Sequence, residues 1–312
     1  MFSDSVRGSN LLNILLGTSN CLLGCGLGFY YGKFSFDSVL LALTILATSV
    51  GICLLCNFSV SYASAYNRYR KSKQKGIIIP LMVGSTSITV VRKTMAIITL
   101  ITSILGFTAI VMAVGSDIQS VSWFAFMVTI AVILSVLFTA AISYYNIFIV
   151  SAGVFLFLGS MFVSGSQLLI IYKSVESFDI YPDSILLSIA CGIVSVVVLQ
   201  FHTVKALKSE ISKGKKNLSL LFSYSISKVI LVVMVSMALI FSCIACFKSH
   251  QAWEICLLML TMIPILYSLF MFLQHDIKGI TESANSTFFT ASFICHNLMW
   301  LAVLFTDYLM YS

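Results

Sequence analysis

Long uninterrupted apolar segments alternate with short polar ones along almost the whole chain. About nine of these runs could cross a bilayer, because roughly 20 helical residues span its hydrocarbon layer. They cover residues 10–31, 37–66, 94–114, 120–143, 146–172, 183–203, 219–246, 251–274 and 288–310. The runs are continuous and lack the apolar and polar alternation of membrane-barrel strands. The pattern predicts an all-α polytopic membrane protein with one domain over 1–312 and about nine transmembrane helices.

The composition points the same way. Hydrophobic residues make up 59% of the chain and charged residues 9%, and the mean hydropathy is +1.04. A water-soluble domain of this length does not carry such a composition, since its surface must be largely polar. We therefore expect a multi-pass protein of the cell (inner or plasma) membrane, with no nucleic acid among its partners.

Two polar segments rich in Lys and Arg interrupt the apolar runs, at residues 57–93 and 202–216. The first contains no carboxylate, and the second contains only Glu210. Lys and Arg in short connections mark the cytoplasmic side of a membrane protein. This rule predicts a cytoplasmic N-terminus and cytoplasmic loops at 67–93 and 204–218. Clusters of this kind also contact anionic phospholipid, which is an expected partner.

Three polar residues at the start of the first basic segment share one face of a helix. Asn57, Ser61 and Ser64 are spaced i, i+4 and i+7, which brings them to one side of an α-helix. The apolar run 37–66 is also longer than the roughly 20 residues needed to cross the membrane. Its last turns are therefore expected to project into the cytoplasm.

Cysteine and histidine do not form an obvious site in this sequence. The nine cysteines lie almost all within apolar runs, and they include the pairs Cys53/Cys56 and Cys243/Cys246. Inside a bilayer Cys usually packs as a small apolar residue, so we expect neither a disulfide framework nor a metal site. His296 stands alone in an apolar run, and we expect it to hydrogen-bond a neighbouring helix.

Several short stretches share a pattern with one family of membrane enzymes. They are Tyr30 to Phe34, Leu40 to Leu46, Asn57 with Tyr62, Pro80-Leu81, Ile88-Thr89, Arg92-Lys93, and Gly214-Lys215 with Leu218. Together with polar loops after the second and sixth helices, they resemble the UbiA-type intramembrane aromatic prenyltransferases. The similarity is closest to the dihydroxynaphthoate polyprenyltransferases of menaquinone synthesis. The resemblance implies a UbiA-like helical bundle that receives an isoprenoid substrate.

The aspartate-rich motifs of that family are degenerate here. In the family, a motif Asn-x-x-Asn-Asp-Tyr-Gly-Asp and a motif Asp-x-x-x-Asp hold Mg²⁺ ions, which neutralise the diphosphate of the polyprenyl donor. The matching stretches of this chain are 57–64 and 206–210, where Ser61 and Ser64 replace aspartates and Glu210 is the one carboxylate left. Mg²⁺ is therefore expected only if the protein is catalytically active, and no other cofactor is expected.

The resemblance and the lost carboxylates together suggest a protein that binds an isoprenoid lipid, a quinone or a polyprenyl (di)phosphate without standard Mg²⁺-dependent catalysis. Such a pseudoenzyme could serve as a subunit of a membrane complex with other membrane proteins. Lysines can hold a phosphate directly, as point charges. The residues expected at the head group are Asn57, Ser61, Ser64, Arg68, Lys71, Lys73, Lys205, Lys208, Glu210 and Lys215.

Two alternatives remain open at this point. One is an active polyprenyltransferase of menaquinone-type quinone biosynthesis, in which Lys and Arg replace the metal ions and Tyr62 or Tyr145 flanks the aromatic acceptor. The other is a transporter component. Transporters often contain an intramembrane charge pair, and the sequence shows no such pair.

Overall fold

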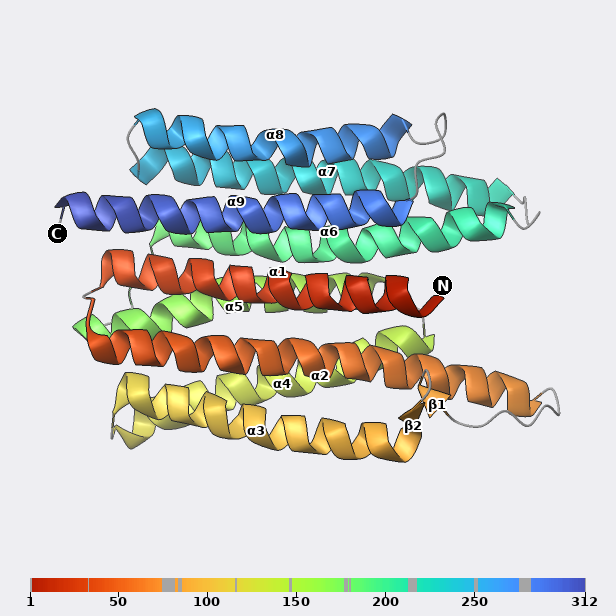
Figure 1. Ribbon diagram of the computed structural model, residues 1–312, viewed down its shortest axis with the longest axis horizontal. Helices are drawn as coiled ribbons and strands as arrows, with labels where there is room; N and C mark the ends of the chain where they lie inside the picture. The colour runs from red at the N-terminus through yellow and green to blue at the C-terminus, as the bar shows by residue number, and fades with distance from the viewer. Residues whose placement is uncertain are drawn as a thin grey trace.

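A computed structural model shows a bundle of long helices (Figure 1). It describes residues 2–32, 34–74, 82–83, 86–115, 117–145, 148–176, 179, 181–212, 218–249, 252–274 and 282–311. The helices are α1 (Phe2–Tyr31), α2 (Phe36–Gln74), α3 (Ile88–Val114), α4 (Ile118–Tyr145), α5 (Phe148–Val175), α6 (Pro182–Ser212), α7 (Leu218–Ser249), α8 (Ala252–Gln274) and α9 (Glu282–Tyr311). Two short strands, β1 (Met82–Val83) and β2 (Thr86–Ser87), pair in antiparallel fashion before α3.

Within the described residues, seven helices are long and apolar enough to cross a membrane. They are α1, α2, α3, α5, α7, α8 and α9. Helices α4 and α6 contribute the shorter apolar stretches Ile118–Ile130 and Pro182–Val198. The expected all-α polytopic membrane protein is thereby confirmed, whereas nine spans and a cytoplasmic N-terminus remain predictions.

The helices fall into two groups of four, α2–α5 and α6–α9, with α1 between them (Figure 1). Helix α1 packs mainly against α5 on one side and α9 on the other, and α5 and α6 join the groups. Each group begins with a helix that runs into a basic segment. Figure 1 shows the C-terminal ends of α2 and α6 at the same end of the bundle as the N-terminus of α1. We call this the basic end.

Close packing of α1 against α5 depends on glycine. A Cβ atom added to Gly24 would lie 2.2 Å from the carbonyl oxygen of Val163, and one added to Gly28 would lie 2.7 Å from Cβ of Ile170. Helices in a membrane approach this closely only where side chains are small, because dispersion contacts and not the hydrophobic effect hold them together.

The helices extend into the segments predicted as cytoplasmic loops. The segment predicted as loop 67–93 is helical up to Gln74 and again from Ile88, and the segment 204–218 is helical up to Ser212. The cytoplasmic loops 67–93 and 204–218 stay a prediction, because the end of an apolar run marks the membrane surface and not the end of the helix. Lys, Arg and Gln are good helix formers in water. Residues 75–81 and 213–217 lie outside the described part of the chain.

Candidate functional site

The expected head-group residues lie on two helices that finish at the basic end. Residues 57–73 belong to α2, and residues 205–210 belong to the last turns of α6. On α2, Asn57 is half-buried and Lys73 is exposed. For the following expected residues the structure describes the helical backbone but not the side chain: Ser61, Ser64, Arg68, Lys71, Lys205, Lys208 and Glu210. Lys215 lies outside the described residues.

Arg92 links α3 to the projecting part of α2. Its Nε atom donates a hydrogen bond of 2.9 Å to the hydroxyl oxygen of Tyr62, and its Nη2 atom donates another. The guanidinium carbon lies 5.5 Å from the centre of the Tyr62 ring, within cation–π range. Arg92 is exposed, and a guanidinium carries five N–H donors in a planar fork. Donors not directed at Tyr62 can therefore bind a phosphate or a carboxylate.

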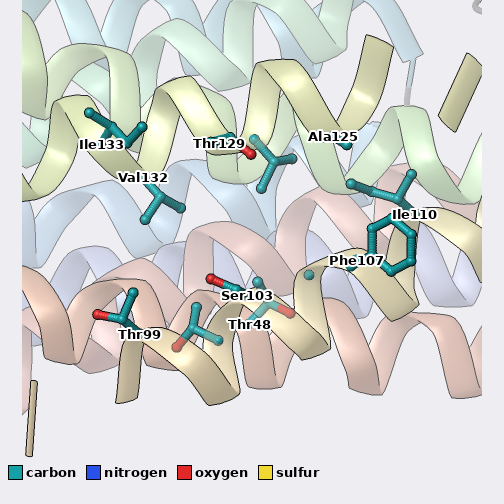
Figure 2. Close-up of a pocket in the computed structure, with 12 residues that line it drawn as sticks. Thr48, Thr99, Ser103, Phe107, Ile110, Ala125, Thr129, Val132 and Ile133 are labelled. Atoms are coloured by element: carbon teal, nitrogen blue, oxygen red, sulfur yellow. The ribbon is translucent and has the colours of Figure 1, made fainter. Parts of the chain in front are cut away.

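A cavity of about 380 Å³ lies between α2, α3 and α4. Figure 2 shows Thr129 and Val132 of α4 on one side of this space and Ser103 and Phe107 of α3 on the other. The volume falls within the range of roughly 300 to 1,000 Å³ typical of small-molecule sites. Its walls are mostly apolar, but hydroxyl groups recur along them.

The cavity continues towards the interior of the first helix group. A smaller space of about 80 Å³ shares Thr48, Gly106 and Val128 with it and reaches Cys21 of α1 and Ser166 of α5. Both of these inner residues are buried. On the other side, several of the α3 and α4 residues that line the larger space are exposed, namely Thr99, Ser103, Phe107, Thr129 and Ile133. The cavity therefore opens sideways between α3 and α4, where a membrane protein meets lipid.

The cavity and the basic end are connected along α3. Thr99 lines the cavity, and it lies two helical turns beyond Arg92, which is a distance of about 10 Å at 1.5 Å per residue. An amphiphile whose head group contacts Arg92 can thus place its chain in the cavity.

A separate set of buried polar side chains ties the second helix group together. His296 of α9 lies 2.7 Å from the hydroxyl of Thr261 on α8 and 2.9 Å from that of Ser242 on α7. Trp300 donates a hydrogen bond of 3.1 Å to Ser242. The expectation that His296 hydrogen-bonds a neighbouring helix is confirmed, because both ring nitrogens have partners.

These bonds also fix the tautomer of His296. The Thr261 hydroxyl donates to the carbonyl of Leu258, so it accepts a proton from Nδ1 of His296. With the proton of the neutral ring on Nδ1, Nε2 is an acceptor, so Ser242, which accepts from Trp300, donates its own proton to Nε2. A neutral imidazole with one donor and one acceptor satisfies this arrangement fully. The network is a structural tie between α7, α8 and α9, and it leaves no ring nitrogen for a ligand.

In the described part of the chain, no three His, Cys, Asp or Glu side chains come together as ligands for a metal ion. Glu210 does not enter this comparison, since its side chain is not described. The cluster of Mg²⁺-binding carboxylates that an active member of the UbiA family needs therefore has no counterpart among the described side chains.

No family model and no curated protein matches this chain. The resemblance to the UbiA family therefore rests on the short stretches of sequence given above and on the positions of the two basic segments.

Sequence reasoning missed the cavity. Its signal along α3 is a series of small or hydroxyl-bearing residues at helical spacing, Thr99, Thr102, Ser103 and Gly106. Such a series is also typical of helix–helix packing in membranes. Only the positions of α2 and α4 show that these residues line a space.

Proposed function

We propose that this protein is a UbiA-like membrane protein that binds an isoprenoid lipid with an anionic or quinone head group and does not catalyse Mg²⁺-dependent prenyl transfer. The observation that carries the proposal is the cavity of the first helix group, which begins about 10 Å along α3 from a guanidinium at the basic end. One amphiphilic molecule can occupy both places.

In this proposal the head group binds at the basic end and the chain lies in the cavity. Lys73 and Arg92 are exposed there. Lys205 and Lys208 belong to the last turns of α6, which finishes at the same end (Figure 1). A cationic site can hold a phosphate without a metal, through charge-assisted hydrogen bonds. The chain enters from the bilayer between α3 and α4, where it exchanges one apolar environment for another.

The missing carboxylates separate this function from catalysis. A leaving diphosphate concentrates negative charge, which Mg²⁺ ions neutralise when several carboxylates hold them. Serines occupy two of those positions, Ser61 and Ser64. Loss of one charge-stabilising contact typically costs about 3 kcal/mol in the barrier, so loss of the metals removes most of the rate.

The proposal includes a topology. Helices α4 and α6 have 28 and 31 residues, more than the roughly 20 needed to cross a bilayer. Counting both as spans gives nine transmembrane helices. The protein then lies in the inner or plasma membrane, with its N-terminus and its basic end in the cytoplasm. Anionic phospholipids then surround the basic end, and other membrane-protein subunits are the expected partners.

Mass spectrometry of lipids that co-purify with the protein tests this function. The wild type is compared with Gly106→Leu, which fills the cavity: a Cβ at Gly106 meets only ordinary contacts, at 3.4 Å from Thr48 and 3.9 Å from Val128. Gly153→Leu is the matched control, since nothing lies within 4 Å of a Cβ there. A second pair is the double variant Lys205→Ala and Lys208→Ala against Lys173→Ala at the opposite end.

We expect an isoprenoid lipid in the wild type and in both controls, and a loss of roughly tenfold or more in the two test variants, the factor that 1.4 kcal/mol of lost binding produces. Recovery of ordinary phospholipid alone from the wild type would overturn the proposal. Equal recovery from Gly106→Leu and Gly153→Leu would remove the chain from this cavity.

A further inference from the structure

Three sulfur atoms converge where α7 packs against α8. The Sγ atom of Cys243 lies 3.8 Å from Sδ of Met259 and 3.5 Å from Sδ of Met262. The two methionines are one helical turn apart on α8, so both point to the same side of that helix. Cys246 follows Cys243 by one turn and is fully buried in the same apolar cluster. The first cysteine of a Cys-x-x-Cys pair on one helix thus faces a Met-x-x-Met pair on its neighbour.

We propose that Cys243, Met259 and Met262 form a binding site for Cu(I). Thiolate and thioether sulfurs are soft ligands, which select Cu(I) over the harder divalent ions. Metal–sulfur bonds of about 2.3 Å in a trigonal plane place the sulfurs about 4 Å apart. The two distances from Cys243 are already close to that value, so small side-chain rotations are enough to admit the ion.

The charge balance favours a monovalent ion. Coordination replaces the thiol proton of Cys243, which leaves to solvent, and the thiolate then neutralises the single charge of Cu(I). The two thioethers add no charge, so the complex is neutral. A divalent ion on the same ligands would leave a net positive charge inside an apolar helix bundle, which is costly. Zn²⁺ also requires more thiolate, imidazole or carboxylate ligands than this cluster offers.

Efficient packing alone does not explain why three sulfur-containing side chains meet here. Met fills irregular gaps in cores, but Leu and Ile do so equally well and dominate the rest of α8. Packing does not require two thioethers to meet one thiol. Met262 is 4% exposed, while Cys243 and Met259 are half-buried, so the cluster is held on one side and accessible on the other.

The cluster lies close to one end of the bundle. Cys243 is about 9 Å from the end of α7 at Ser249, at 1.5 Å per residue. Figure 1 shows that this end of α7 is opposite the basic end. The ion therefore reaches the site from the membrane surface remote from the proposed lipid head group. The site lies in the second helix group and does not depend on the proposed lipid function.

Anaerobic titration of the full-length purified protein with Cu(I), in competition with a chromogenic Cu(I) chelator, tests the proposal. The wild type is compared with Cys243→Ala, Met259→Leu and Met262→Leu. Cys295→Ala and Met310→Leu serve as controls, because both residues are exposed on α9 and neither belongs to the cluster. Leu conserves the volume of Met, so these variants keep the fold, which thermal unfolding of the apo-protein verifies.

We expect one Cu(I) per chain in the wild type and in both controls, with X-ray absorption showing sulfur ligands near 2.3 Å. Each cluster variant should bind at least about tenfold more weakly, as losses of even outer ligand-positioning groups cost about 10- to 100-fold. If the wild type binds Cu(I) no more tightly than the three cluster variants, or if the controls weaken binding equally, the cluster is not a Cu(I) site.

Discussion

Gly24 lies where the backbone of α1 touches that of α5, and it shows how strictly a single position can be determined. The obstacle to a larger side chain there is the main chain of Val163, which cannot rotate away as a side chain could. By contrast, Gly153 of α5 faces open space. The same residue type is therefore indispensable at one site and replaceable at the other.

Replacing Gly24 with Leu should separate α1 from α5 and remove much of the folded protein. Overpacking typically lowers the free energy of unfolding by about 1–3 kcal/mol and occasionally more. A clash with the backbone should cost an amount near the upper limit of this range. Thermal unfolding and size-exclusion chromatography in detergent measure the effect. Gly153→Leu should behave like the wild type, and equal behaviour of the two variants would contradict the close contact.

Replacing His296 with Leu should destabilise the second helix group. The change leaves the Ser242 proton without its acceptor, while Thr261 still donates to Leu258, and an unsatisfied buried polar group costs about 1–3 kcal/mol. Thermal unfolding reports the loss, and Trp300 fluorescence reports the local change, since its N–H is bonded to Ser242. An unaltered melting temperature would show that the network contributes nothing to stability.

At the scale of single helices, the ends are determined by local hydrogen bonds. Helix α4 begins directly after Asp117, whose carboxylate accepts hydrogen bonds from the backbone N–H groups of Gln119 and Ser120. This is the usual arrangement of a helix N-cap. A hydrogen bond from the Ser120 side chain, together with these backbone bonds, lowers the pKa of Asp117.

Because the pKa of Asp117 is lower in the folded protein than in the unfolded chain, its contribution to stability is present above the unfolded value of 3.8. The contribution is lost as the pH falls through the folded pKa. Replacing Ser120 with Ala should raise the pKa of Asp117 towards its ordinary value. Carboxyl-carbon NMR titration measures this shift, and identical titration curves for the two proteins would refute the role of Ser120.

At the scale of the whole molecule, two groups of helices divide the proposed roles. The first group holds the cavity that we propose for the lipid, and the second holds the hydrogen-bond network of His296 and the sulfur cluster. Helix α1 packs against both groups and fixes their relative positions. Lipid binding and Cu(I) binding can therefore be disrupted separately.

The purified protein should form no prenylated product from a polyprenyl diphosphate and dihydroxynaphthoate, with or without Mg²⁺. The reason follows from the proposed function: where the UbiA family has carboxylates that hold the metal ions, this chain has Ser61 and Ser64. Liquid chromatography with mass detection of the products measures this. Product formation that depends on Mg²⁺ would show that the remaining ligands suffice, and would make the protein an active transferase.

The sequence alone determined the helices and their membrane character. Hydrogen bonds within an α-helix are local, and a bilayer demands that every backbone group be satisfied within its segment, so an apolar run of sufficient length specifies a helix wherever it lies. The partnered state of His296 was also predictable, since a polar side chain in apolar surroundings needs a hydrogen-bond partner.

The tertiary structure alone decided which helices meet. The cavity exists because α3 and α4 enclose a space beside Thr48 and Gly106, and the sulfur cluster exists because Cys243 faces Met259 and Met262 across two helices. Neither contact can be read from spacing along one chain segment, because helix pairing depends on how side chains on different segments fit together. The sequence specifies the helices and the basic segments, whereas the packing of the helices forms the cavity and the sulfur cluster.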